Sequence, residues 1–172
     1  MNDTALLIID LQYDYFPDGA YPLWQADEVK NNIIKAIGKA KEKGILPIHI
    51  QHVADPSQGL SPFFNEGTHG VDIIADIKAA APDAPIVVKH YADGFHKTEL
   101  EGVLSEHNIK KLLVCGMMTQ NCVTHTSISK DAEKYDVAII SDLCTTVTEL
   151  LHLIALNAVS TRMKLVNAAD VL

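Results

Sequence analysis

The chain has 172 residues, of which 48% are hydrophobic and 21% are charged, values that are normal for a packed globular core. This length fits one domain of ordinary size, so we expect residues 1–172 to form a single domain. The formal net charge of −8, without a lysine and arginine cluster, argues against nucleic acid or an anionic membrane as a partner. No apolar run approaches the roughly 20 residues that a membrane span requires.

The N-terminus and the cysteines favour a reducing, cytoplasmic setting. Residues 1–4 lack a basic region before the first apolar stretch, so we expect no secretory signal. The three cysteines, Cys115, Cys122 and Cys144, are odd in number and contain no Cys-x-x-Cys pair. A disulfide framework or a zinc ribbon is therefore not expected, and each of the three is a candidate free thiol.

Short apolar runs alternate with helical patterns along the whole chain. The runs predict strands over residues 5–9, 45–50, 85–88, 111–114, 137–140 and 163–166. The helical patterns cover residues 25–43, 71–80, 98–107, 120–134 and 148–159. This alternation predicts an α/β fold, with a parallel sheet covered by helices on both faces. Residues 53–70 are rich in glycine and proline, and a loop of that length is usually functional or mobile.

Three reactive side chains are expected at the edge of the sheet where its strands end. Asp10 directly follows the first strand, Lys89 follows the third, and Cys122 lies a few residues after the fourth. Ligands of open α/β sheets bind outside the carboxyl ends of the strands. Each residue also has a structural interpretation: Cys122 as a small buried residue, Asp10 as a loop brace, and Lys89 as a solvated lysine.

Together these side chains have the chemistry for nucleophilic catalysis. A cysteine attacks as its thiolate, and both a helix start and the Lys89 ammonium would lower the pKa of Cys122. Asp10 would take the thiol proton and return it to a leaving group. Cys115 and Cys144 each stand at the end of an apolar strand, and we interpret both as structural.

Three motifs in order along the chain carry a family resemblance. They are residues 6–16 (Leu-Leu-Ile-Ile-Asp-Leu-Gln-Tyr-Asp-Tyr-Phe), residues 87–89 (Val-Val-Lys) with a following Phe and Thr-Glu-Leu, and residues 114–123 (Val-Cys-Gly-Met-Met-Thr-Gln-Asn-Cys-Val). They resemble the opening strand, the lysine segment and the Gly-x-x-Thr-x-x-Cys-Val signature of the isochorismatase-like cysteine hydrolases. Nicotinamidases and N-carbamoylsarcosine amidases belong to the same superfamily. The resemblance covers nearly the whole chain.

The resemblance implies a three-layer α/β/α fold whose six-stranded parallel sheet has the order 3-2-1-4-5-6. It implies Asp10, Lys89 and Cys122 as the catalytic residues, although that order separates the strands of Asp10 and Lys89 by roughly 10 Å. It further implies a non-proline cis peptide at Met117–Met118, and an oxyanion hole formed by the backbone N–H groups of Met118 and Cys122. Members of the family are usually homo-oligomers, so a dimer or tetramer is expected.

The substrate pocket and the metal content can also be predicted. Side chains near the strand-end loops are expected to line the pocket: Tyr13, Phe16, Trp24, His52, Phe95, Gln120 and Asn121. The aromatic ones among them could instead anchor those loops. Nicotinamidases of the superfamily bind a metal through an Asp-x-His segment after the second strand. Here that segment reads His52-Val53-Ala54, so we expect neither that metal site nor any other cofactor.

The sequence therefore predicts a cysteine-dependent hydrolase of a small-molecule substrate, an amide or a related C–N compound, acting through a thioester. One alternative is an isochorismatase-type hydrolase that cleaves a vinyl ether, in which the cysteine need not attack. Another is a catalytically silent binding member of the family. A nucleotide-binding Rossmann module is not favoured, because no Gly-x-Gly-x-x-Gly follows the first strand.

Overall fold

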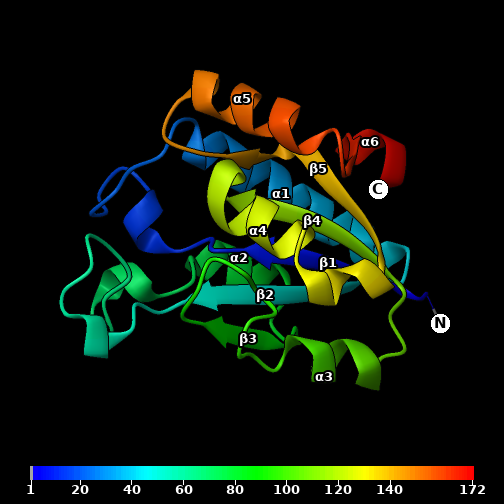
Figure 1. Cartoon of the computed structure of the whole chain (residues 1–172), viewed down its shortest axis with the longest axis horizontal. Helices are drawn as coiled ribbons and strands as arrows, with labels where there is room; N and C mark the ends of the chain where they lie inside the picture. The colour runs from blue at the N-terminus through cyan, green and yellow to red at the C-terminus, as the bar shows by residue number, and fades with distance from the viewer. Residues whose placement is uncertain (1) are drawn as a thin grey trace.

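The computed structural model describes residues 2–172 and confirms the predicted α/β fold (Figure 1). Its strands pair in parallel in the order β3-β2-β1-β4-β5-β6, which is the order implied by the family resemblance. The strands are β1 (Thr4–Ile9), β2 (Leu46–His52), β3 (Ile86–Lys89), β4 (Lys111–Met117), β5 (Asp136–Thr145) and β6 (Lys164–Val166).

Helices cover both faces of this sheet, as the alternating pattern predicts. They are α1 (Ala26–Glu42), α2 (Ala75–Ala80), α3 (Leu100–Glu106), α4 (Thr124–Ser127), α5 (Glu149–Val159) and α6 (Ala168–Val171). Successive residues of β1 alternate between two hydrophobic clusters: Leu6 and Ile8 pack with α1 and α2, whereas Leu7 and Ile9 pack with α3. No helix within residues 2–172 is both long enough and apolar enough to cross a bilayer.

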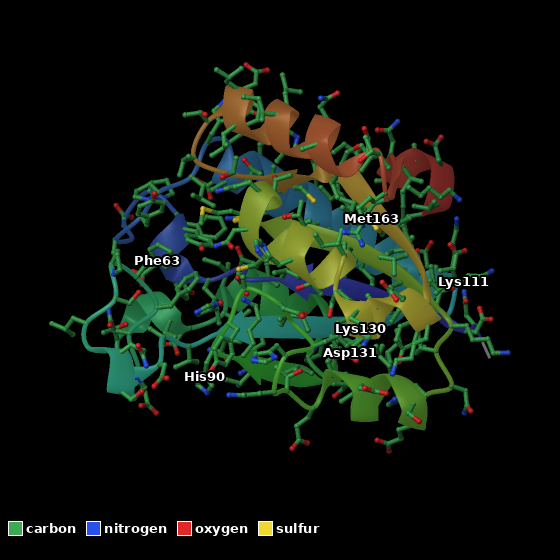
Figure 2. All side chains as sticks on the ribbon, in the orientation of Figure 1. Phe63, His90, Lys111, Lys130, Asp131 and Met163 are labelled. Atoms are coloured by element: carbon green, nitrogen blue, oxygen red, sulfur yellow. The ribbon has the colours of Figure 1, made fainter. Side chains whose placement is uncertain are left out.

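The long loop marks the carboxyl end of the strands. Phe63 of this loop and Lys111, the first residue of β4, lie at opposite ends of the molecule (Figure 2). Phe64 is fully buried, and its N–H donates to the Asp14 Oδ2 atom at 2.7 Å, while the other oxygen of Asp14 accepts the N–H of Ala20 at 3.1 Å. The buried carboxylate of Asp14 thus joins the loop to the segment that follows β1.

The sequence predicts one continuous helix over residues 120–134, and this prediction is wrong, because the structure has three separate helical segments there. The chain forms a π-helix, η4 (Thr119–Val123), then α4, and then a separate 3₁₀ helix, η5 (Lys130–Lys134). Ser129 caps η5 by accepting the N–H of Asp131, and its hydroxyl donates to Asp93. These local bonds compete with helix continuation, which is the usual behaviour of a serine at a helix boundary.

The predicted helix over residues 71–80 begins late. Gln12 and Ile73 form an isolated antiparallel bridge, and the N–H of Ile74 donates to the carbonyl of Leu11. Extended pairing with the segment after β1 therefore holds residues 73 and 74, and α2 begins only at Ala75.

Pro47 lies within β2, between two neighbouring strands, although proline lacks the N–H that a central strand needs. The pairing of β2 with β3 begins only at His49 and Ile86, and the N–H of His49 donates to Pro85. Backbone nitrogens two residues apart face the same side of a strand, so the nitrogen of Pro47, like that of His49, faces the β3 side. At the level of Pro47, β3 has not yet begun. The sheet loses no hydrogen bond there.

Gly116 lets β4 approach β1 closely just before the site described below. Its φ is +118°, and an added Cβ atom would lie 2.1 Å from the carbonyl oxygen of Ile9. The register between β4 and β5 also shifts between Val114 and Gly116. A side chain at this position would therefore push apart the two strands that lead to the candidate site.

We expect the Gly116→Ala variant to lose more than about 2 kcal/mol of unfolding free energy, because the added methyl group meets backbone that cannot move aside easily. Gly38→Ala is the matched control: this exposed position in α1 has open space, and alanine there should stabilise the helix by up to about 1 kcal/mol. Urea unfolding of the two variants measures both effects. A Gly116→Ala midpoint equal to that of the wild type would contradict the close approach.

Candidate active site

Asp10 follows β1 directly, at a sharp turn of the chain. Its φ is +55°, a left-handed conformation that aspartate tolerates better than most residues. Its N–H donates to the carbonyl of Ile50 at 3.0 Å, and its own carbonyl accepts the N–H of Gln12 at 2.9 Å. The side chain is completely buried, so its charge requires compensation.

Lys89 supplies that compensation from β3, two strands away in the sheet. In the sheet, Lys89 pairs with His52 of β2, and β2 lies between β3 and β1. The buried ammonium nevertheless reaches Asp10 Oδ2 at 3.1 Å, so the long side chain bridges the gap that the strand order creates. Its Nζ also lies 3.2 Å from Cys122 Sγ and 2.8 Å from His52 Nδ1. A lysine ammonium has three N–H donors, and these contacts use all of them.

Cys122 lies in η4, the π-helix that follows β4, and is only 2% exposed. The carbonyl of Met118 accepts the N–H groups of Asn121 and Val123, which ties the start of η4 to the end of β4. The peptide bond between Met117 and Met118 is cis. We call Asp10, Lys89 and Cys122 the acid–amine–thiol cluster, since the three separate segments bring them into contact.

Burial dominates the proton affinities within this cluster. Burial raises the pKa of Asp10 despite the opposing charge of Lys89. Burial disfavours the charged form of Lys89, but the charges of Asp10 and Cys122 outweigh this effect and raise the pKa of the ammonium. Burial and the Asp10 charge raise the pKa of Cys122, and Lys89 offsets only part of that shift. The sequence-based expectation of a lowered thiol pKa is therefore wrong, and the resting thiol keeps its proton at neutral pH.

The carboxylate of Asp10 retains one free acceptor for that proton. Its Oδ2 atom accepts from Lys89, whereas no group within residues 2–172 donates a hydrogen bond to its buried Oδ1 atom. Asp10 also lies within 4.8 Å of Cys122, measured between a carboxylate oxygen and Sγ. The arrangement can therefore pass a proton from the thiol to the carboxylate while the ammonium holds the second oxygen.

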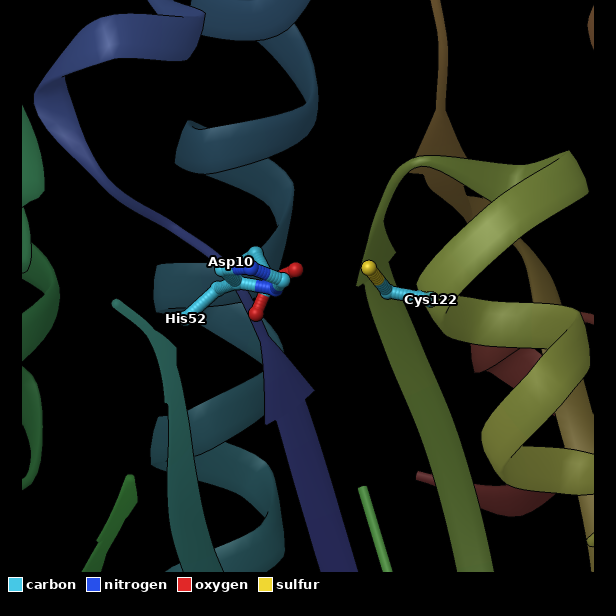
Figure 3. A group of neighbouring side chains, drawn as sticks. All are labelled: Asp10, His52 and Cys122. Carbon is cyan, nitrogen blue, oxygen red and sulfur yellow. The ribbon is translucent and has the colours of Figure 1, made fainter. Parts of the chain in front are cut away.

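The same neighbourhood offers ligands to a metal ion. Donor atoms of Asp10, His52 and Cys122 all lie within 4.8 Å of one another (Figure 3). Lys89 Nζ, however, already donates to all three side chains. A cation there would have to displace a buried ammonium or lie against a like charge, so these residues fit a lysine better than a metal.

Two of the predicted pocket residues, Tyr13 and Phe16, line a cavity of about 680 Å³ that the acid–amine–thiol cluster does not line. The Tyr13 ring lies 4.1 Å from the His69 ring, and its hydroxyl accepts the N–H of Ala75. The Phe16 ring lies 5.7 Å from Lys30 Nζ. Both aromatics therefore brace surrounding segments, and their contact with substrate stays a prediction.

The remaining predicted pocket residues lie on several elements. The Trp24 ring is 6.2 Å from that of His152, and Phe95 is buried with its ring stacked 6.0 Å from that of Tyr135.

Gln120 donates weakly to the sulfur of Met118, while its buried Oε1 atom has no partner within the described residues. The carbonyl of Asn121 accepts from Thr124 and His125 in the following turn. Gln120 thus keeps a polar atom available, and all four roles stay predictions.

Gln12 is a structural residue that the sequence argument missed. Its side chain is fully buried: Oε1 accepts the N–H of His52 at 2.8 Å, and Nε2 donates to the carbonyls of His52 and Val71, each at 2.7 Å. The amide therefore holds the end of β2 against the segment after β1. The available signal was a polar residue two positions after Asp10, next to the apolar strand of residues 5–9.

Comparisons with known proteins show the family and the fold of this chain. A family model described as the isochorismatase domain matches residues 4–170. The isochorismatase family protein YddQ of Bacillus subtilis is 34% identical over 145 residues, covering 84% of this chain and 79% of that protein. A streptothricin hydrolase of Streptomyces noursei is 28% identical over 123 residues, covering 72% of this chain and 46% of that protein. The crystal structure of an isochorismatase-like hydrolase from Alkaliphilus metalliredigens has a TM-score of 0.88 at 24% identity, covering 98% of this chain and 97% of that chain.

The fold is an open parallel α/β sheet, a class of protein that binds ligands outside the carboxyl ends of its strands, where Asp10, Lys89 and Cys122 meet. Within that class, the chain belongs to the isochorismatase family. Membership of this family, together with its hydrolase relatives, supports a hydrolase.

The raised thiol pKa predicts how stability depends on pH. The unfolded thiol loses its proton near its usual pKa of 9.0, while the folded thiol keeps it. Its contribution to stability is thus complete below the unfolded pKa and is lost as the pH rises toward the folded pKa. Between about pH 9 and pH 11, this thiol should make the unfolding free energy of the wild type fall by up to about 1.4 kcal/mol per pH unit. Cys122→Ser lacks the thiol, so its unfolding free energy should fall less steeply by that amount. Urea titrations at several pH values measure the slope, and equal slopes would show an unshifted thiol.

Proposed function

We propose that this protein is a cysteine-dependent hydrolase of a small amide or a related C–N substrate, acting through a thioester. The observation that carries the proposal is the Lys89 ammonium, which contacts Asp10 Oδ2 at 3.1 Å and Cys122 Sγ at 3.2 Å. A nucleophile, a proton acceptor and a fixed positive charge are the parts that acyl transfer needs.

In the first half of the reaction, Cys122 Sγ attacks the carbonyl carbon and its proton moves to Asp10 Oδ1. Deprotonation coupled to attack suits a thiol of raised pKa, because thiolates of higher pKa are intrinsically better nucleophiles. Asp10 suits the task because burial brings its pKa upward from the ordinary acidic range, toward the range where proton transfer in both directions is effective. Lys89 remains charged throughout and holds the other carboxylate oxygen.

In the second half, Asp10 returns the proton to the departing amine as the C–N bond breaks, leaving a thioester on Cys122. Asp10 then accepts a proton from water, the hydroxide attacks the thioester, and the proton passes back to the sulfur as the acid leaves. The backbone N–H groups of Met118 and Cys122 are our candidates for stabilising the oxyanion in both halves. The overall change is one amide and one water giving one acid and one amine.

The burial of the cluster favours a small substrate. Cys122 and Lys89 expose almost no surface, so little of a substrate beyond its reacting group fits beside them without movement of the neighbouring segments. Gln120, with its unpartnered Oε1, is our candidate for recognising an N–H group of that substrate. The streptothricin hydrolase among the relatives supports hydrolysis as the general reaction.

The raised pKa of Asp10 also favours a second candidate, the cleavage of a vinyl ether. A protonated carboxyl can donate its proton to the ether substrate, and this reaction needs no covalent bond to the sulfur. The two candidates therefore differ in whether Cys122 carries an acyl group during turnover.

We expect Cys122→Ala to lower kcat by about 10³-fold or more on any amide that the wild type hydrolyses, since the nucleophile is gone. The substrates to test are a panel of small amides, carbamoyl compounds and isochorismate. Cys144→Ala is the matched control, because that buried thiol lies in β5 and donates to the carbonyl of Ile140. The control should keep the wild-type kcat, and an unchanged kcat in Cys122→Ala would contradict the proposal.

Intact-mass spectrometry during turnover separates the two candidates. A wild-type chain heavier by the acyl group of the substrate, with the added mass absent from Cys122→Ala, supports the thioester. Turnover of isochorismate without added mass, retained in Cys122→Ala and lost in Asp10→Asn, would instead favour ether cleavage.

A further inference from the structure

The shortest contact of the Lys89 ammonium is not with its carboxylate partner. Nζ lies 2.8 Å from His52 Nδ1, against 3.1 Å from Asp10 Oδ2 and 3.2 Å from Cys122 Sγ. A charged lysine can only donate hydrogen bonds, so His52 Nδ1 must be an unprotonated acceptor. It follows that the imidazole of His52 is neutral and carries its proton on Nε2.

The surroundings hold this imidazole in place. Gln12 binds both the N–H and the carbonyl of His52, at 2.8 and 2.7 Å, and so anchors its backbone. The ring itself lies 5.8 Å from the ring of Phe64, which is fully buried. A residue whose backbone and ring are both held can fix the position of the group that it binds.

We propose that His52 is a positioning residue of the active site: its neutral imidazole accepts one N–H of Lys89 and thereby directs the other two at Asp10 and Cys122. This inference rests on the proposed function and assigns His52 a task other than the substrate contact expected from sequence. His52 acts through Lys89 and does not touch the reacting atoms.

A neutral acceptor has an electrostatic advantage at this position. A carboxylate would also accept from Lys89, but its charge would cancel the field that the ammonium exerts on the sulfur. Burial and the nearby charges of Lys89 and His90 lower the pKa of His52 to about 3, so the imidazole stays neutral across the physiological range. Lys89 therefore gains a third partner without losing its positive charge, and Asp10 is the carboxylate that contacts it among residues 2–172.

The test is a series of substitutions at His52 with kcat and KM measured separately. His52→Phe keeps a ring but removes the acceptor, and we expect kcat to fall by about 10²-fold with little change in KM, because a loosened ammonium misplaces both partners. His52→Asn restores an acceptor of similar reach, and should recover most of the lost kcat. A rise in KM at unchanged kcat would make His52 a substrate contact and overturn the proposal.

The pH profile of Cys122 alkylation by iodoacetamide gives a readout that needs no substrate. Between pH 7 and pH 9 the thiol is mostly protonated, so the alkylation rate follows the small thiolate fraction. His52→Phe should lower this rate, His52→Asn should restore it, and His52→Asp should lower it because the added anion opposes the thiolate. A residue that only stabilises the fold would leave the rate unchanged in all three variants, and that result would overturn the proposal.

Two further measurements keep the result interpretable. His107→Asn is the matched control, since His107 is exposed, follows α3 and contacts the carbonyl of Val103 rather than the cluster. Its kcat and alkylation profile should equal those of the wild type. If His52→Phe does not fold, nitrogen NMR of the wild-type imidazole still decides the matter. A neutral ring protonated on Nε2 at pH 7, altered in Lys89→Met, supports the proposal, and a ring protonated on Nδ1 overturns it.

Failure of this inference can be told apart from failure of the proposed function. If Cys122→Ala is inactive while His52→Phe behaves as the wild type, only the role of His52 is wrong. If Cys122→Ala stays active on amides, the thioester mechanism fails, whereas the alkylation profiles still report on the coupling between His52, Lys89 and the thiol.

Discussion

The buried ammonium of Lys89 connects the segments that build the site. It donates to Asp10 after β1, to His52 at the end of β2 and to Cys122 in η4, so each contact is between residues far apart in sequence. Removing a charge from water is costly unless every donor finds an acceptor and an opposite charge lies near. Here the three acceptors match the three N–H groups of lysine, and one of them is a carboxylate. Loss of any acceptor leaves a buried donor unpaired.

The sheet topology dictates that a long side chain makes this connection. β3 is an edge strand, and β2 separates it from β1, so a residue at the end of β3 reaches Asp10 only by crossing β2. The pairing of Lys89 with His52 places the lysine stem beside the imidazole that accepts from its tip. Gln12 completes the arrangement, because it binds the backbone of His52 from the segment that also carries Asp10.

Burial has opposite consequences for fold and chemistry at this edge. It strengthens the contact between Lys89 and Asp10, but it also keeps the proton on Cys122. In the proposed mechanism, the unpartnered Oδ1 atom of Asp10 would accept that proton during attack, so the neighbouring carboxylate rather than resting ionisation would activate the thiol.

Local patterns in the sequence determined much of this protein. The alternation of apolar runs and helical periods identified the parallel sheet, and the placement of Asp10, Lys89 and Cys122 at strand ends predicted their meeting, because parallel strands end at one edge. The family resemblance supplied the strand order, which periodicity cannot. Only the tertiary structure decided the break at Ser129, the third acceptor at His52 and the raised pKa of Cys122. Those three depend on which distant groups surround a side chain and how far water is excluded, and residue spacing carries no information about either.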